Sequence, residues 1–322
     1  MRELFTREKT NPIITADMMP YSVNTVFNPG VAEYDGYTVL LVRVEDLQGQ
    51  SHLTVARSKN GVDNWEIEPK PLIFPQPDTD EYAYEQFGCE DARVTYIPER
   101  QEYFICYTAY SPVGPGVATA ITSDFVSVKK SGLILPPNNK DAAIFPRKFN
   151  NKWVMLHRPV AGDIEHIWLT SSSDLIHWGE PKCLLPERGG PWWDAARVGA
   201  GAPPIETEQG WLIIYHGVKT TTSGAIYRLG LALVDKGNPY KLLFRHPRWV
   251  FGPTESYERH GDVSNVVYTC GAIVRGDELW MYYGGADSCV CLARAKLRDV
   301  LHELTEFTGR AASSHFIKCG LG

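Results

Sequence analysis

The sequence predicts an all-β protein that folds as a five-bladed β-propeller with a short C-terminal helix. One local pattern occurs five times: an apolar strand, a tight polar turn and a second strand rich in aromatic residues. The turns fall at positions 36, 99, 150, 209 and 276, so the copies are evenly spaced. This spacing fits one four-stranded sheet per copy, and a radial propeller protects the edges of many short antiparallel strands.

Each copy has its own strand and turn signals. The strands that follow the turns begin at Tyr37, Tyr103, Trp153, Trp211 and Leu279. They are apolar runs that follow tight polar turns, which is typical of strands. The turns are Asp35-Gly36, Glu99-Arg100, Asn150-Asn151, Gln209-Gly210 and Gly276-Asp277. Helical spacing occurs only at residues 297–307, where positions 297, 300, 301 and 304 are apolar, so a small C-terminal helix is predicted there.

The chain is predicted to be a single catalytic domain over residues 1–322. Its 28 Gly and 22 Pro residues lie between the copies and do not gather in one linker, so no domain boundary is visible. We expect residues 311–322, which lack any pattern, to be a frayed tail. A pair of β-sandwiches is the alternative fold, and the evenness of the five hairpins argues against it.

Composition excludes several classes of partner. The 322 residues are 43% hydrophobic and 22% charged, which suits a globular protein with a sizeable core. The net charge of −6 provides no global basic field, so neither nucleic acid nor an anionic membrane is an expected partner.

The charged N-terminus does not resemble a signal peptide, and we expect a cytoplasmic protein. A homo-oligomer is compatible with the sequence.

The seven cysteines are interpreted as reduced thiols. They are odd in number and lack the spacing of metal ligands, so no metal is predicted. Cys289 and Cys291 share one face of a strand, where packing is a commoner role than metal binding.

Polar residues gather at the ends of the predicted inner strands. In a propeller these ends converge on one axial pocket. Carboxylates, guanidinium groups, imidazoles and aromatic rings together suit a sugar ligand. The positions are Asn28, Arg43, Glu90, Asp91, Tyr110, Lys140, Asp141, His157, Arg158, Asp194, Arg197, His216, Asp262, Asn265 and Asp287.

Motifs in nearly the whole chain resemble those of glycoside hydrolase family 130. They include Phe27-Asn28-Pro-Gly-Val, Gly88-Cys-Glu90-Asp91-Ala-Arg93, Met155-Leu-His157-Arg158-Pro and Tyr283-Gly-Gly-Ala-Asp287. The resemblance implies an inverting β-mannoside phosphorylase on a five-bladed propeller. It implies a reaction that uses inorganic phosphate as co-substrate and needs no cofactor.

The resemblance also implies roles for single residues. Asp91 matches the general acid, which would pass its proton to the glycosidic oxygen through the 3-hydroxyl of the mannosyl unit. The mannosyl unit would be held by Asn28, Arg43 and Asp287. The strand-end pattern, rather than the resemblance, adds Tyr110 and His216 as predicted substrate contacts. Phosphate would be held by Arg57, Lys140, His157 and Tyr227. The family pattern has a lysine where this chain has Arg197, which keeps the charge but not the shape, so a direct role for this position is open.

Each of these residues also has a plain structural interpretation. Asp91 could pair with Arg93 across a strand, Asp287 could be a turn residue, and His157 and His216 could be satisfied core histidines.

Physical reasoning favours phosphorolysis over hydrolysis. An inverting hydrolase needs a second carboxylate, roughly 6.5 to 9.5 Å from the acid, to activate water. Phosphate is already an anion and needs only cations to neutralise and aim it. A β-mannoside hydrolase of the same family and a noncatalytic sugar-binding propeller are the alternatives. The linkage, β-1,4 or β-1,2, and the acceptor sugar (mannose, glucose or N-acetylglucosamine) are not coded by any motif in this one sequence.

Overall fold

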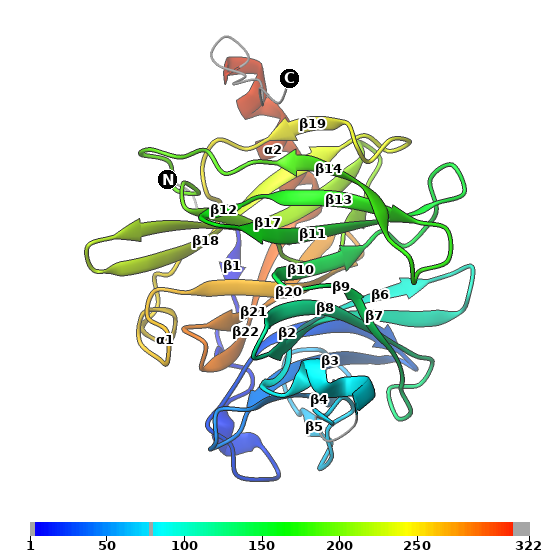
Figure 1. The fold of residues 1–322 in the computed structure, drawn as a ribbon. Coiled ribbons are helices and arrows are strands. Elements are labelled where there is room, and N and C mark those ends of the chain that lie inside the picture. The colour runs from blue at the N-terminus through cyan, green and yellow to red at the C-terminus, as the bar shows by residue number, and fades with distance from the viewer. Residues whose placement is uncertain (1–3, 77–79, 312–322) are drawn as a thin grey trace.

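The protein is almost entirely β-structure, as predicted. Figure 1 shows the computed structural model, which describes residues 4–76 and 80–311. The predicted C-terminal helix is confirmed as α2 (Leu297–Ala311), and a single-turn helix, α1 (Ser256–Arg259), precedes the last sheet. Two short 3₁₀ helices lie at Ala16–Met18 and Asp80–Glu85. The predicted frayed tail lies outside the described residues except for Ala311, and no helix in the described part is long and apolar enough to cross a bilayer.

The described strands form four hydrogen-bonded sheets, whereas the sequence predicts five blades. The first sheet contains β2 (Thr25–Tyr34), β3 (Tyr37–Glu45), β4 (Ser51–Ser58), β5 (Glu66–Ile67), β6 (Gly88–Ile97), β7 (Glu102–Ser111), β8 (Gly114–Thr122) and β9 (Lys129–Leu135). Its two halves meet at one parallel pair, Ser51 and Gly88, between β4 and β6. This bridge is the reason that the first two predicted units count as one eight-stranded sheet.

The other three sheets each follow one predicted unit. The second contains β10 (Asn139–Ile144), β11 (Trp153–Ala161), β12 (Ile164–Glu165), β13 (Ile167–Ser172) and β14 (Gly179–Leu185). The third contains β15 (Arg197–Ala200), β16 (Ile205–Glu206), β17 (Trp211–Thr221), β18 (Gly224–Val234) and β19 (Leu242–Arg245). The fourth contains β20 (Val267–Arg275), β21 (Glu278–Gly285), β22 (Cys289–Lys296) and the N-terminal strand β1 (Thr6–Arg7), which pairs with β22.

The hairpins follow from their turn residues. Asp35 and Gly36 join β2 to β3 with φ values of 50° and 76°, and Asn150 and Asn151 precede β11 with φ values of 49° and 62°. Asn, Asp and Gly tolerate this left-handed conformation, and two such residues in a row make the turn whose twist matches antiparallel strands. The strand that follows each predicted turn is present in the structure, as β3, β7, β11, β17 and β21.

The hydrophobic core lies between neighbouring sheets. Phe104 of β7 packs in one cluster with Met155 of β11, Leu156 of β11 with Ile213 of β17, and Val42 of β3 with Leu292 of β22. Helix α2 adds Val300, Leu301 and Leu304 to the cluster between the third and fourth sheets. Each buried large apolar side chain contributes about 1.5 to 3 kcal/mol to folding. The sheets are therefore held to one another chiefly by these layers.

A β-bulge interrupts four of the strands that begin the predicted units. The register shifts lie between Phe27 and Gly30 in β2, Glu90 and Arg93 in β6, Lys140 and Ala143 in β10, and Thr269 and Gly271 in β20. These strands contact one another, β2 with β6 and β20, and β6 with β10. Because bulges redirect side chains, polar residues at these points leave the regular alternation and converge.

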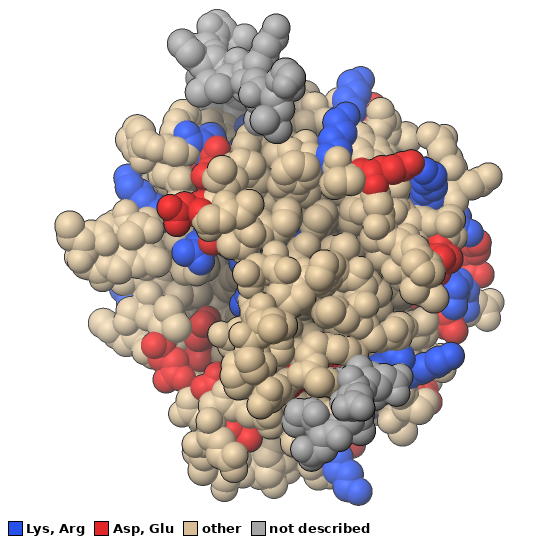
Figure 2. All heavy atoms as spheres, viewed as in Figure 1, with Lys and Arg blue, Asp and Glu red and all other residues tan. Residues whose placement is uncertain are grey.

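The surface carries charges of both signs. On the face shown in Figure 2, Lys and Arg side chains lie among Asp and Glu side chains, mostly toward the rim, and uncharged residues cover the middle. A cavity of about 1130 Å³ lies among β1, β18 and α2, with Arg228, Trp249 and Glu303 in its lining. Of the polar strand-end residues predicted to line the axial pocket it contains Asn265, and it contains none of the residues predicted to act in catalysis or to bind sugar or phosphate.

Candidate active site

Asp91 lies at the bulge of β6 with its side chain turned toward β2 and β3. It is buried, and its φ of 52° is left-handed, like that of Asn28 at the bulge of β2 (φ 45°). Asn28 donates from Nδ2 to Asp91 Oδ1 over 3.0 Å, and Arg43 Nη1 lies 3.3 Å from the same oxygen. The structure therefore brings the predicted acid together with two of the three residues predicted to hold the mannosyl unit.

Arg43 joins Asp91 to a second carboxylate. Its Nη2 lies 3.2 Å from Glu90 Oε1, and its Nε donates to Ser51 Oγ over 2.9 Å. The guanidinium carbon lies 4.6 Å from the ring centre of Phe27. With donors engaged on two sides and a ring beneath, the guanidinium is fixed in one orientation.

The electrostatics around Asp91 favour its ionised form. Burial opposes ionisation, but the charges of Arg43 and Arg93 and the hydrogen bond from Asn28 outweigh it, so the pKa of Asp91 is lowered. Asp287, in the turn between β21 and β22, is affected in the opposite way. Burial, reinforced by the charge of Asp91 and opposed by Arg43, raises the pKa of Asp287 to about 7.

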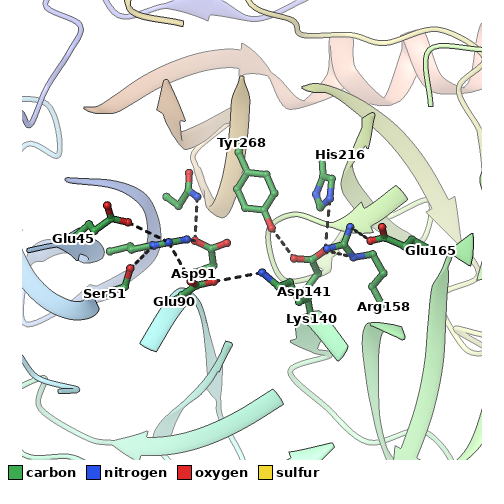
Figure 3. A network of polar contacts seen from close by, with 12 residues as sticks. Glu45, Ser51, Glu90, Asp91, Lys140, Asp141, Arg158, Glu165, His216 and Tyr268 are labelled. Atoms are coloured by element: carbon green, nitrogen blue, oxygen red, sulfur yellow. Dashed lines mark hydrogen bonds and ion pairs between the residues drawn. The ribbon is translucent and has the colours of Figure 1, made fainter. Parts of the chain in front are cut away.

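Asp141 forms a second buried centre at the bulge of β10. Its φ is 55°, and its carboxylate accepts from Arg93 Nη2 at 3.1 Å and from the Tyr268 hydroxyl at 2.6 Å. Arg158 Nε lies 2.9 Å from Asp141 Oδ2, and His216 Nε2 lies 3.5 Å from that oxygen (Figure 3). Burial would raise the pKa of Asp141, but the surrounding positive charges, that of Arg158 foremost, lower it well below its usual range.

Arg93 ties the two centres together. Besides Asp141, it donates to the backbone carbonyls of Asp91, Ala200 and Gly201 at 2.9 to 3.3 Å. Only 1% of its side chain is exposed. It also donates to the Tyr268 hydroxyl over 2.7 Å. A single guanidinium thus contacts residues of β6, β10, β15 and β20, which explains why the Arg of the Gly-x-Glu-Asp-x-Arg motif is buried.

The remaining cations of the site pair with two further carboxylates, Glu165 and Glu90. Arg158 Nη1 and Arg197 Nε lie 2.7 Å and 3.5 Å from the carboxylate of Glu165 on β12. Lys140 Nζ lies 3.4 Å from Glu90 Oε2 and 5.8 Å from the ring centre of Tyr110. The exposed Tyr110 ring is also 5.4 Å from the ring of Phe87.

Two buried histidines carry ring nitrogens with no hydrogen-bond partner among the described residues. These are Nδ1 of His216, whose ring lies 6.1 Å from that of Tyr227, and Nε2 of His157. Burial lowers the pKa of His216 to about 3 and that of His157 to about 4, and it raises the pKa of Tyr227. Both imidazoles are therefore neutral near pH 7. His157 contacts Asn139 over 3.2 Å, on the face of β11 that carries Met155.

The structure does not bring Arg57 to this site. Arg57 pairs with Glu68 and donates to the carbonyl of Phe125 over 2.8 Å. It lies opposite Val39 near one end of β4, whereas Ser51, which contacts Arg43, lies at the other end. A strand advances about 3.3 Å per residue, so the six steps from Ser51 to Arg57 separate them by about 20 Å. The predicted phosphate contact at Arg57 is therefore corrected.

Sequence reasoning missed several members of the network. It named Glu90, Asp141 and Arg158 only as polar strand ends, and it singled out neither Glu165 nor Tyr268. The strand-end pattern was a usable signal for the first three. Glu165 lies on the two-residue strand β12, for which the sequence has no signal.

Known proteins match this chain along nearly its whole length. A family model described as β-1,4-mannooligosaccharide phosphorylase matches residues 5–306. A β-1,2-mannobiose phosphorylase of Listeria innocua is 36% identical over 92% of this chain and 98% of its own length. A β-1,4-mannooligosaccharide phosphorylase of Ruminococcus albus is 33% identical over 93% of this chain and 90% of its own.

Solved structures show the same relationship. That of the Listeria innocua enzyme with β-1,2-mannobiose has a TM-score of 0.84 and 35% identity, covering 93% of this chain and 99% of that one. A structure described with glycoside hydrolases that target β-1,2 mannosidic linkages in Candida mannan has a TM-score of 0.81 and 26% identity, covering 92% of this chain and 95% of that one. The match over nearly its whole length shows that the chain belongs to glycoside hydrolase family 130.

Proposed function

We propose that the protein is an inverting phosphorylase that cleaves a β-mannosidic bond with inorganic phosphate. The products are α-D-mannose 1-phosphate and a shortened or free sugar acceptor, so the reaction is a hexosyl transfer to phosphate. The observation that carries the proposal is a buried carboxyl group, Asp91, whose neighbours include Arg43 at 3.3 Å and Lys140, linked through Glu90. Relatives at 33% and 36% identity bear phosphorylase names, which supports the same reaction here.

Asp91 acts as the general acid of this reaction. In its protonated form it gives its proton to the 3-hydroxyl of the mannosyl unit, which passes a proton to the departing glycosidic oxygen. Asn28 and Arg43 contact Asp91 directly and therefore orient it as well as the sugar. Asp287, with a pKa of about 7, can accept or donate a hydrogen bond to a mannosyl hydroxyl.

Phosphate binds on the side of Asp141 where the cations gather. We assign the contacts to Arg158, Arg197, His216 and Tyr227, with Lys140 at the border toward Glu90. The neutral His216 offers an unpartnered Nδ1, and Arg197 has 37% of its side chain exposed, so both can meet an incoming anion. His157 remains a candidate through its unpartnered Nε2, whereas Arg57 is replaced by Arg158 and Arg197.

The same geometry favours phosphate over water as the nucleophile. An inverting hydrolase needs a free carboxylate to act as base. Asp141 is already engaged by Arg93, Arg158 and Tyr268, and Glu165 by Arg158 and Arg197. A dianion needs no base, only cations that neutralise its charge and aim an oxygen at the anomeric carbon. The reaction therefore needs inorganic phosphate as co-substrate and no metal or organic cofactor.

We further propose that the sheets are the five blades of a propeller formed by one domain. The eight-stranded sheet divides naturally at the single Ser51 to Gly88 bridge. Contacts of β20 with β2, β2 with β6, β6 with β10, β10 with β15, and β18 with β20 support a ring. Matching turns also recur before the fourth strand of three units, where the carboxamide or carboxylate oxygens of Asn60, Asp124 and Asp174 each accept a backbone N–H two residues on at 2.9 Å.

Phosphate-dependent product formation tests the function. The enzyme should be incubated with β-1,2-mannobiose and with β-1,4-mannobiose, each with and without inorganic phosphate. Mannose 1-phosphate should form from at least one of them only when phosphate is present. Free mannose released without phosphate would instead identify a hydrolase, and binding of the disaccharides without turnover would identify a sugar-binding protein.

A further inference from the structure

A continuous chain of charges links the acid to the border of the phosphate site. Asp91 Oδ1 lies 3.3 Å from Arg43 Nη1, Arg43 Nη2 lies 3.2 Å from Glu90 Oε1, and Glu90 Oε2 lies 3.4 Å from Lys140 Nζ. Figure 3 shows Glu90 between Asp91 and Lys140. Glu90 is 7% exposed, so these contacts are screened little by solvent. Glu90 is therefore the group through which a charge near Lys140 can affect Arg43 and Asp91.

The two carboxylate oxygens of Glu90 contact different cations: Oε1 contacts Arg43, beside the acid, and Oε2 contacts Lys140, at the border of the phosphate site. A phosphate dianion beside Lys140 carries twice the charge of Glu90 and competes with it for the ammonium group. Lys140 is 31% exposed and flexible enough to turn toward such an anion. Glu90 then keeps Arg43 as its remaining ionic partner and attracts that guanidinium more strongly. Because Arg43 is also the nearest cation to Asp91, its hold on Asp91 weakens.

This weakening matters because a general acid must hold a proton before it can donate one, and Asp91 is stabilised as a carboxylate. Arg43 and Asn28 stabilise its carboxylate before substrates bind. The other charged or titratable groups that act on it are Arg93 on β6, Lys140 on β10, Tyr268 and Cys270 on β20, and Asp287 beyond β21. Of these, Lys140 combines contact with Glu90 and partial exposure, so an anion can change the environment of Asp91 most directly through it.

We propose that Glu90 is a positioning residue that couples anion binding at Lys140 to proton uptake by Asp91. The inference rests on the proposed function. A proton from the buffer joins the Asp91 carboxylate as the anion enters. When a phosphate oxygen forms its bond to the anomeric carbon, the glycosidic bond breaks and its electron pair goes to the departing oxygen, which receives this proton through the 3-hydroxyl. Anion binding thus protonates Asp91 at the step in which it must donate a proton.

Sulfate is the probe for this coupling, because it is a dianion without a proton that titrates near pH 7. Calorimetric titration of the protein with sulfate, in buffers of different ionisation enthalpy, counts the protons taken up on binding. We expect the wild type to take up protons as it binds sulfate. Asp91→Asn should lose most of this uptake. Glu90→Gln should bind sulfate and show less than half of the wild-type uptake.

A matched control is available on the second sheet, which also contains Lys140. Glu180 pairs with Lys152 on the second sheet, as Glu90 pairs with Lys140, but 64% of its side chain is exposed. Glu180→Gln should therefore match the wild type in uptake, in sulfate affinity and in melting temperature. Glu90→Gln is isosteric, and its melting temperature shows whether it remains folded.

Three results would overturn the coupling, two from the variants and one from the wild type. Asp91→Asn with wild-type uptake would mean that another group, such as Asp287, takes the proton, and Glu90→Gln with wild-type uptake would remove Glu90 from the path. The failure of the proposed function is distinct from these. A protein that binds neither sulfate nor phosphate loses both proposals, whereas sulfate binding without proton uptake, in a protein that makes mannose 1-phosphate, contradicts the coupling alone.

Discussion

At the scale of single residues, backbone conformation decides which side chains reach the site. Asn28, Asp91 and Asp141 have φ values of 45°, 52° and 55°. Non-glycine residues rarely adopt this left-handed region, and Asn and Asp tolerate it best. At each of them a bulge redirects the side chain away from the strand's regular alternation. The residue types are visible in the sequence, but the bulges that make them meet are not.

The same limit explains the correction at Arg57. A motif of six residues, Gly88 to Arg93, was enough to identify Asp91 as the candidate acid. The position of Arg57 depends instead on how far along β4 it lies, and sequence resemblance places a residue on a strand without showing which end faces the pocket. The pairing of Glu165 with Arg158 and Arg197 depends on three separate strands and was equally invisible.

Asp91→Asn tests the acid. The change is isosteric, so the fold should remain, but the side chain loses its transferable proton. General acid catalysis contributes about 10² to 10⁴ in rate, and kcat should fall by that factor. Initial rates of mannose 1-phosphate formation measure it, with Asp277→Asn, in an exposed pair with Lys296, as the control. More than half of the wild-type rate in Asp91→Asn would refute the assignment.

Arg197→Met tests the revised phosphate site. Loss of a hydrogen bond to a charged group costs about 1.5 to 3 kcal/mol, which is roughly ten- to hundredfold in affinity. The KM for phosphate should rise by this factor while the KM for the mannoside changes little. Arg57→Met makes the same chemical change away from the site and should leave both constants near their wild-type values. If Arg57→Met raised the phosphate KM and Arg197→Met did not, the original assignment would be restored.

At the scale of elements, the sequence predicts hairpins better than it predicts the pairing of strands that are distant in the sequence. All five strands after the predicted turns exist, because apolar runs mark the strands and Asn, Asp or Gly marks four of the turns. The second turn, at Glu99 and Arg100, contains none of these three residue types. The pairing of β1 with β22 joins residues near the two ends of the chain, and the β4 to β6 bridge is one residue pair. Such non-local contacts leave no periodic pattern in the sequence.

The attachment of β1 makes a prediction about stability. Arg7 on β1 donates to both carboxylate oxygens of Glu258, at 2.7 Å and 2.9 Å, and the Glu258 side chain is fully buried. Arg7→Met leaves that charge without its main partner, which typically costs about 3 to 5 kcal/mol. Urea unfolding should show this loss, whereas Arg298→Met, 79% exposed on α2, should change stability by no more than about 0.5 kcal/mol. Equal unfolding midpoints for the two variants would show that the Arg7 pair does not hold β1 in place.

At the scale of the whole molecule, the site is assembled from strands of every sheet. Asn28 and Asp91 belong to the first sheet, Lys140 and Arg158 to the second, Arg197 and His216 to the third, and Tyr268 to the fourth. Burial and neighbouring charges shift the pKa values of several of these groups, among them Asp91, His216 and Tyr268. The stability of the whole protein should therefore depend on pH in a way that these groups determine.

His157 provides a test of that dependence. Burial lowers its pKa from 6.5 to about 4, so between these values the unfolded chain binds more protons and stability falls as the pH falls. Each such group contributes up to about 1.4 kcal/mol per pH unit. His216 acts in the same direction, whereas Asp287, with its pKa raised from 3.8 to about 7, favours the folded state as the pH falls. His157→Asn should flatten the curve of unfolding free energy between pH 6.5 and about pH 4, and a curve parallel to that of the wild type would show that His157 is not buried as a neutral group.

The stereochemistry of the first product tests the proposed phosphorolysis most directly. Phosphate that attacks the anomeric carbon opposite the leaving group, in one displacement with no covalent sugar intermediate, inverts the configuration. Proton and phosphorus NMR during turnover of a β-mannobiose should show α-mannose 1-phosphate as the first new mannosyl species, in an amount equal to the phosphate consumed. A β-configured sugar phosphate, or free mannose formed without consumption of phosphate, would contradict the account.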